Sequence, residues 1–104
     1  IASFLRVLNA LENIRASVDA LTRAGSARLD DAQRRSELEQ ALADTRDAIR
    51  VLAEAGLHPA AIAPLQQAHR LIRRALHGWY ARAQRIEQAI ELHRKARAEL
   101  IAGT

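Results

Sequence analysis

The sequence predicts an all-α domain, an antiparallel bundle of three helices with a long C-terminal helix and coiled-coil-like, alanine-rich packing. Half of the 104 residues are hydrophobic, yet there is only one Phe, one Trp and one Tyr, so a core must consist of Leu, Ile, Val and Ala. Strong helix formers dominate, whereas the four Gly and two Pro stand at evident breaks. Apolar residues also recur at alternating spacings of three and four, the pattern of helices that pack on helices. A chain of this length forms one domain, residues 1–104.

The first helix is expected over residues 3–24. Leu5 and Leu8 widen its apolar stripe, which is typical of a helix buried on more than one side. Gly25 stands where a C-terminal cap is expected. The positions in the alternating pattern are Phe4, Val7, Leu11, Ile14, Val18 and Leu21.

The second helix is expected over residues 30–55. Its start has two alternatives: Asp30 or Asp31 as the N-cap, or a capping box formed by Ser36 and Glu39. Gly56 ends the helix. The apolar pattern holds Leu38, Leu42, Thr45, Ile49 and Leu52.

The third helix is expected over residues 64–102. Pro59 suits the first position of a short turn, but the ring of Pro64 would clash with the carbonyl of Ala60 in a regular helix, so the long helix should begin near Pro64. The apolar pattern runs from Ile62 to Leu100 and passes Gly78 without a change of phase. We therefore expect one continuous helix, and a break at Gly78 would instead give four helices.

A continuous third helix predicts a homodimer. At 1.5 Å per residue it would be ~58 Å long, well beyond the reach of the two shorter helices. Its last part would leave an apolar stripe uncovered, and a second copy is the simplest cover. The predicted oligomer interface consists of Ala83, Ile86, Ile90, His93, Arg97, Leu100 and Ile101.

Basic residues gather in the second half of the chain. Residues 1–57 carry a net charge of −1 and residues 58–104 a net charge of +5, with no acidic residue between Glu54 and Glu87. Such a run can bind the phosphates of acidic lipids, phosphoinositides included, or of nucleic acid. A lipid surface is favoured over nucleic acid because no helix-turn-helix or zinc-finger signature is present. The candidate residues are Arg70, Arg73, Arg74, Arg82 and Arg85, with Trp79 and Tyr80.

Ion pairing explains the same arginines without a ligand. If the second and third helices are neighbours, Asp44 lies beside Arg70, and the aspartates near residue 30 lie beside Arg82 and Arg85. We favour this interpretation, because charge runs on helices are usually solvated faces. Trp79 lies on the apolar pattern and is expected to cap the core.

The sequence indicates no metal site, no cofactor and no enzymatic activity. His69 and His93 are ~36 Å apart along one helix, and neither has a carboxylate or a second His one turn away. There is no Cys, no Gly-rich phosphate loop and no nucleophile elbow.

These observations predict a non-enzymatic helical interaction or oligomerisation module. The alternatives are a module that binds anionic surfaces, and a chaperone-like groove for a partner helix. We expect a fragment of a larger bacterial protein, because the chain begins with Ile1 and holds fifteen Arg to one Lys. No apolar run approaches the ~20 residues of a membrane span and no signal-peptide pattern is seen, so the cytoplasm is the default location.

Overall fold

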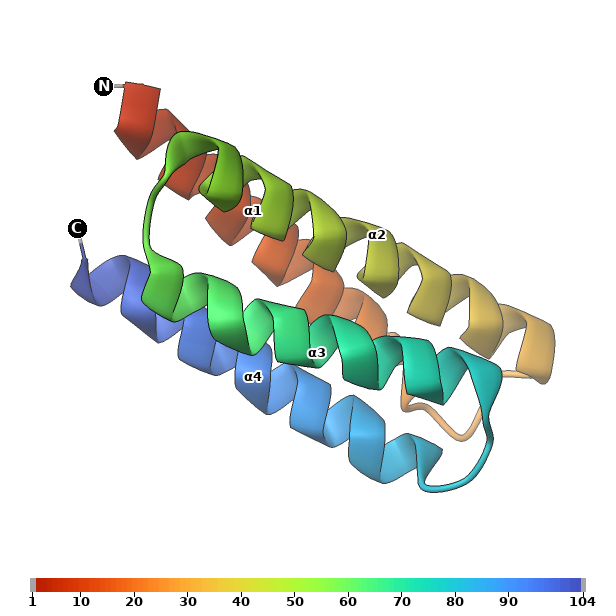
Figure 1. The fold of residues 1–104 in the computed structure, drawn as a ribbon. Helices are drawn as coiled ribbons and strands as arrows, with labels where there is room; N and C mark the ends of the chain where they lie inside the picture. Colours follow the sequence, from red (N-terminus) through yellow and green to blue (C-terminus); the bar gives the residue numbers. More distant parts are fainter. Residues whose placement is uncertain (1, 104) are drawn as a thin grey trace.

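The computed structural model describes residues 2–103, which form four helices and, within that range, no strand. The helices are α1 (Ala2–Ala24), α2 (Asp31–Ala55), α3 (Pro59–His77) and α4 (Arg82–Ala102). Figure 1 shows them side by side, with the chain reversing direction at each of the three connections. Both ends of the chain therefore lie at one end of a body that measures 43 × 19 × 18 Å. The all-helical class is confirmed.

The expected continuous helix over residues 64–102 is wrong, because the chain turns back at Gly78. Gly78 has extended backbone (φ −144°, ψ 143°), and its N–H donates to the carbonyl of Arg74. The Nε of Arg82 donates to the carbonyl oxygen of Ala75 at 2.9 Å, satisfying an acceptor that no helical N–H reaches. The connection of four residues, 78–81, is about as long as one helical turn, so the apolar pattern crosses it without a change of phase.

Helix α3 begins at Pro59, five residues earlier than expected. Pro59 occupies the first turn, where a missing N–H leaves no helical hydrogen bond unmade. Pro64 lies inside the helix, one turn later, and its side chain is buried. Because Pro64 is so close to the start, its missing N–H removes a single bond to the first turn, and the helix tolerates this loss.

The core consists of two clusters, one at each end of the bundle. The cluster beside the α1–α2 and α3–α4 connections includes Leu21, Leu38, Ile72, Leu76 and Ile86. The cluster nearer the chain termini includes Val7, Ile14, Leu52, Leu65 and Leu100. Ten alanines with no exposed surface lie among them, and their small side chains let the helices approach closely.

Two residues in left-handed backbone give a test of local strain. Gly56 ends α2 at φ 65°, and a Cβ added there would meet nothing within 4 Å. Ala81 precedes α4 at φ 54° and makes no side-chain cap. We expect Gly56→Ala to lower the free energy of unfolding by about 1 kcal/mol and Ala81→Gly to raise it by up to about 1 kcal/mol. Urea unfolding of both variants measures this, and shifts of the same sign would contradict it.

Candidate functional site

Some residues of the predicted oligomer interface lie in the core of the domain, and the others lie on its surface. Ile86 is 3% exposed and Leu100 is 0% exposed, because α4 folds back along α3 and turns these side chains into the domain's own core. The uncovered stripe that predicted an obligatory second copy is therefore not formed. Of the other predicted interface residues, His93 is buried, Ile90 is half-buried, and Ala83, Arg97 and Ile101 are exposed.

A polar cluster lies in the middle of this core. Ser17 of α1, Thr45 of α2 and His93 of α4 are each 0% exposed. The Nε2 of His93 lies 2.9 Å from the Ser17 hydroxyl and 2.8 Å from the Thr45 hydroxyl, and the two hydroxyls are 2.9 Å apart. The carbonyl oxygen of Ala41 lies 3.2 Å from the Ser17 hydroxyl and 2.7 Å from the Thr45 hydroxyl, within hydrogen-bond distance of both. Three helices are thus joined by hydrogen bonds at one level of the bundle.

The proton positions in this cluster follow from its acceptors. The Nδ1 of His93 lies 2.6 Å from the carbonyl of Ala89, which can only accept, so Nδ1 carries the proton. In the neutral ring, Nε2 then accepts from one of the two hydroxyls, and the other hydroxyl is free to donate to the carbonyl of Ala41. Burial lowers the pKa of His93, and the hydrogen bond to Ala89 opposes this shift.

The pair of Ser17 and His93 has the distance of a nucleophile and its base, but its surroundings favour a structural role. The Ser17 side chain has no exposed surface through which a substrate could approach. A fully hydrogen-bonded buried cluster instead favours one alignment of the helices over others. Sequence reasoning placed Thr45 and His93 on the apolar pattern but did not bring them together. The available signal was that polar residues interrupt the apolar patterns, Thr45 in the second predicted helix and His93 among those in the third.

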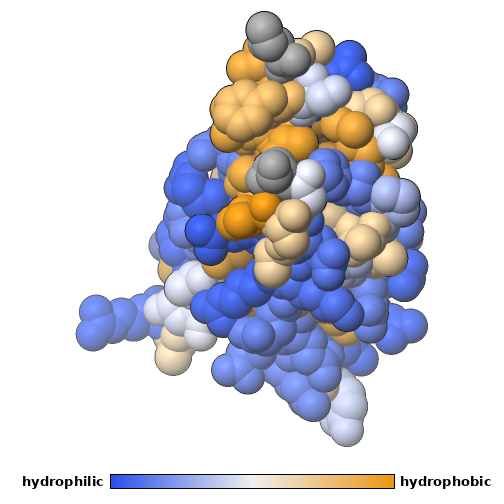
Figure 2. Space-filling view, turned by 90° about the vertical axis from the view of Figure 1, so that its left-hand side faces the viewer, coloured by the Kyte–Doolittle hydropathy of each residue, from blue (hydrophilic) through white to orange (hydrophobic). Residues whose placement is uncertain are grey.

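Large apolar side chains are exposed at the end of the bundle that carries the chain termini. On α1, Phe4 is 58%, Leu5 58% and Leu8 45% exposed, and on α4 Ile101 is 51% exposed. Figure 2, which faces this end, shows hydrophobic side chains gathered in its upper half and hydrophilic ones below. Leu8, Leu11 and Ile101 also line a groove of about 540 Å³ between α1 and α4. We call Phe4, Leu5, Leu8, Leu11 and Ile101 the α1–α4 face.

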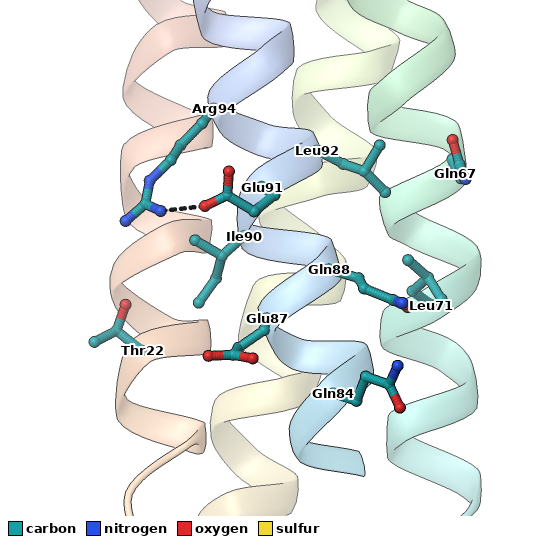
Figure 3. A pocket seen from close by; sticks show the side chains of 10 residues that line it. All are labelled: Thr22, Gln67, Leu71, Gln84, Glu87, Gln88, Ile90, Glu91, Leu92 and Arg94. Atoms are coloured by element: carbon teal, nitrogen blue, oxygen red, sulfur yellow. Dashed lines mark hydrogen bonds and ion pairs between the residues drawn. The ribbon is translucent and has the colours of Figure 1, made fainter. Parts of the chain in front are cut away.

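A second hollow, along α4, brings no reactive groups together. Figure 3 shows its side chains on two sides of α4: Glu87, Ile90 and Arg94 on the side of α1, and Gln84, Gln88 and Leu92 on the side of α3. Its one ion pair joins Arg94 to Glu91 within α4. These side chains do not converge on a point where a ligand would be held.

The structure contains none of the ion pairs expected between the second and third helices. Among residues 2–103 no ion pair joins α2 to α3. Asp44, which was expected beside Arg70, accepts from the amide of Gln40 one turn earlier in α2 at 3.1 Å. Glu37 pairs with Arg23 of α1 at 2.6 Å, and Glu39 pairs with Arg35 one turn away at 3.2 Å. The ion-pair explanation of the basic run is therefore wrong.

The basic run itself has two parts. Arg82 and Arg85 are half-buried and donate to the carbonyls of Ala75 and Arg74, so they fasten the end of α3. The other three arginines are exposed on α3 and have no acidic partner. Together with His77 they line one surface hollow, which consists of Arg70, Arg73, Arg74 and His77.

The environment of His69 shows how strongly positive this part of the surface is. Burial is the main cause that lowers the pKa of His69, and the charges of Arg73, Arg46 and Arg70 lower it further. Arg46 belongs to α2, so the positive field extends across both helices. No acidic group contributes to this shift.

Trp79 and Tyr80 lie in the α3–α4 connection and project from the end of the bundle. Trp79 is 81% exposed and Tyr80 is 72% exposed, so the expectation that Trp79 caps the core is wrong. The two rings meet edge to face, with centroids 6.4 Å apart and planes at 75°. The break at Gly78 explains the error, because it turns Trp79 away from the apolar side of α3.

The described residues include no group of three His, Cys, Asp or Glu side chains that could hold a metal ion. None of the four helices combines the length and the apolar character needed to cross a bilayer. Compared with known proteins, the chain matches no family model, no curated protein and no solved structure.

Proposed function

We propose that this domain is a non-enzymatic helical interaction module that binds a protein through the α1–α4 face. The observation that carries the proposal is the exposure of Phe4, Leu5, Leu8 and Ile101 at one end of the bundle. A single exposed apolar side chain is ordinary, but a contiguous group of them is typical of a binding surface.

The groove beside this face suits a second helix. It lies between two helices, and its floor includes apolar residues such as Leu11 and Val18. Amphipathic helices bind in such grooves by placing their apolar side chains along them. A second copy of this chain supplies such a helix in α1 itself, so an isologous homodimer is the first partner to test. Arg97 and Ile101 of the predicted interface belong to this groove.

The molar mass in solution, measured by light scattering during gel filtration, tests self-association. We expect the wild type to be a dimer and the double variant Leu5→Asp with Leu8→Asp to be a monomer, because two carboxylates on the face oppose its burial. The matched control is Ala63→Asp with Gln66→Asp, which places two charges at the same spacing on exposed positions of α3.

The control should remain dimeric. A wild type that stays monomeric at high concentration would rule out the homodimer. Its groove would then be tested with an amphipathic helical peptide, and absence of peptide binding would contradict the interaction module as well.

A second candidate function is the binding of an anionic surface. The observation that favours it is the group of three exposed arginines on α3, Arg70, Arg73 and Arg74, none of which has an acidic partner. An electrostatic surface of this kind binds phosphate groups in a manner that weakens as salt is added.

A further inference from the structure

The geometry points to the α3–α4 end of the bundle as a site that docks on the surface of a bilayer containing anionic lipids. We define the docking tip as Trp79 and Tyr80 together with Arg70, Arg73, Arg74 and His77. In this proposal the two aromatic rings enter the headgroup region while the arginines bind lipid phosphates. The inference rests on the second candidate function and assigns its ligand and its orientation.

The aromatic side chains are the first argument. Trp79 and Tyr80 are the most exposed large hydrophobic side chains of the described residues. Rings that combine an apolar body with a polar N–H or O–H are enriched where membranes meet water. The connection that carries them is held in place, since the N–H of Gly78 donates to Arg74 and Arg82 donates to Ala75. Little ordering is therefore needed when the tip binds.

The arginines are the second argument. Arg73 and Arg74 lie one turn before His77, the last residue of α3, and Arg70 lies one turn earlier in the same helix. Each basic side chain close to an anionic bilayer strengthens binding about fivefold, so three of them together contribute roughly a hundredfold. The positive field is also felt within the protein, because the charges of Arg73 and Arg70 act on His69.

The charges of the neighbouring connection do not cancel this field. Figure 1 shows the α1–α2 connection at the same end of the bundle as the α3–α4 connection. The connection itself holds one basic and one acidic residue, Arg28 and Asp30. The charged side chains of the helix ends that flank it are matched in pairs, which are Arg23 with Glu37, Arg34 with Asp31, and Arg35 with Glu39. Residues 55–86, by contrast, contain no acidic side chain at all. The net positive charge of this end therefore comes from α3 and the start of α4.

The arrangement favours a bilayer over a nucleic acid. From Arg70 to His77 the helix rises only ~10 Å, and the headgroup region of one leaflet is ~5–8 Å deep. The charged and aromatic groups are thus confined to a single end of an elongated body. Proteins that bind a nucleic acid strand usually have a groove whose basic side chains lie along the whole bound strand, with aromatic rings between them that stack on the bases.

The single tryptophan of the chain gives a direct measurement. Wild-type protein is mixed with phosphatidylcholine vesicles that contain phosphatidylserine, with pure phosphatidylcholine vesicles, and with a short DNA duplex, at low and at high salt. We expect the Trp79 emission to shift to shorter wavelength with the anionic vesicles alone, and cosedimentation with them to weaken as salt is raised.

Two double variants, each lacking two positive charges, distinguish binding by the docking tip from binding by the net charge of the protein. Arg73→Gln with Arg74→Gln should weaken vesicle binding about 25-fold. Arg6→Gln with Lys95→Gln removes two exposed positive charges, one in the first two turns of α1 and one in the second half of α4, away from the α3–α4 connection. At about 0.1 M salt this control should bind within about twofold of wild type, because the Debye length is then about 10 Å and both charges lie farther than that from the tip. Both double variants should keep the wild-type circular dichroism spectrum.

Each remaining outcome has a defined meaning. Equal binding by the two double variants, or binding of DNA without vesicles, would overturn the docking proposal. Salt-sensitive vesicle binding that depends on Arg73 and Arg74 but leaves Trp79 emission unchanged would overturn the orientation while the anionic-surface function stands. Absence of binding to vesicles and DNA alike would overturn both.

Discussion

Replacement of Ile86 by Asp is expected to unfold the domain. Ile86 is 3% exposed and belongs to the core cluster that also holds Leu38, Ile72 and Leu76. A carboxylate at this position has no basic partner, and an unpaired buried charge costs at least about 3 kcal/mol in addition to the lost apolar contacts. The total stability of a single domain is roughly 5–15 kcal/mol. Thermal melting followed by circular dichroism should show a lost or greatly lowered transition.

Ala83→Asp is the matched control for this prediction. Ala83 lies three residues earlier in α4, is exposed, and belonged to the same predicted interface. An acid in the first turn of a helix is favourable, so the melting temperature should stay close to that of the wild type. A continuous third helix predicts otherwise, since both substitutions would then yield a folded monomer. A wild-type melting transition in Ile86→Asp would contradict the four-helix bundle.

The first two helices were predictable because their signals are local. The expected ranges were 3–24 and 30–55, and the observed helices are Ala2–Ala24 and Asp31–Ala55. Asp30 caps α2 by accepting from the N–H of Gln33, and the Gln33 side chain accepts from the N–H of Asp30. Gly56 supplies the left-handed residue that ends the helix. Each of these signals lies within a few residues of the boundary that it marks.

The break at Gly78 was not predictable from periodicity. A reversal through four residues keeps the apolar phase, so a continuous helix and a hairpin have the same pattern. The contact that distinguishes them joins Arg82 to the carbonyl of Ala75, and it forms only after the chain has turned. The wrong expectation that Trp79 caps the core, and the burial of Ile86 and Leu100 within the domain rather than on its surface, both follow from this one break.

The candidate sites were predictable in composition but not in arrangement. The basic run was correctly identified as free of acids along the chain, yet its members have two roles, since Arg82 and Arg85 fasten α3. The polar cluster joins Ser17, Thr45 and His93 from three helices. The relative register of separate helices is set by tertiary packing, which no single helix encodes.

The stability of the domain is expected to fall as the pH is lowered through the range where an unfolded histidine gains its proton. Burial lowers the pKa of His93, so the unfolded chain binds a proton at a higher pH than the folded chain does. The free energy of unfolding is therefore highest above pH 6.5 and decreases below it, by up to about 1.4 kcal/mol per pH unit for one proton. The decrease ends only when the folded state also binds the proton.

The groups around His93 support this direction. The ring contacts the hydroxyls of Ser17 and Thr45 and the carbonyl of Ala89, and none of these is an anion that would stabilise an imidazolium. The adjoining α1–α4 groove, whose lining includes His93, carries charged side chains of both signs: Glu12, Arg15, Asp19, Arg94 and Arg97. None of them is a cause of the pKa shift of His93. Protonation therefore places an uncompensated charge between the two core clusters.

Urea unfolding between about pH 7.5 and about pH 5 measures this loss, in a range where carboxylates stay ionised. His93→Gln is the control, because its amide can still bond to both hydroxyls but binds no proton, so its stability should change much less with pH. His69 also has a lowered pKa, but it is half-buried, and His69→Asn separates its smaller share. If His93→Gln kept the full pH dependence of the wild type, the proton uptake that lowers the stability would occur at a group other than His93. The cluster would then hold the helices in register without making their packing depend on pH.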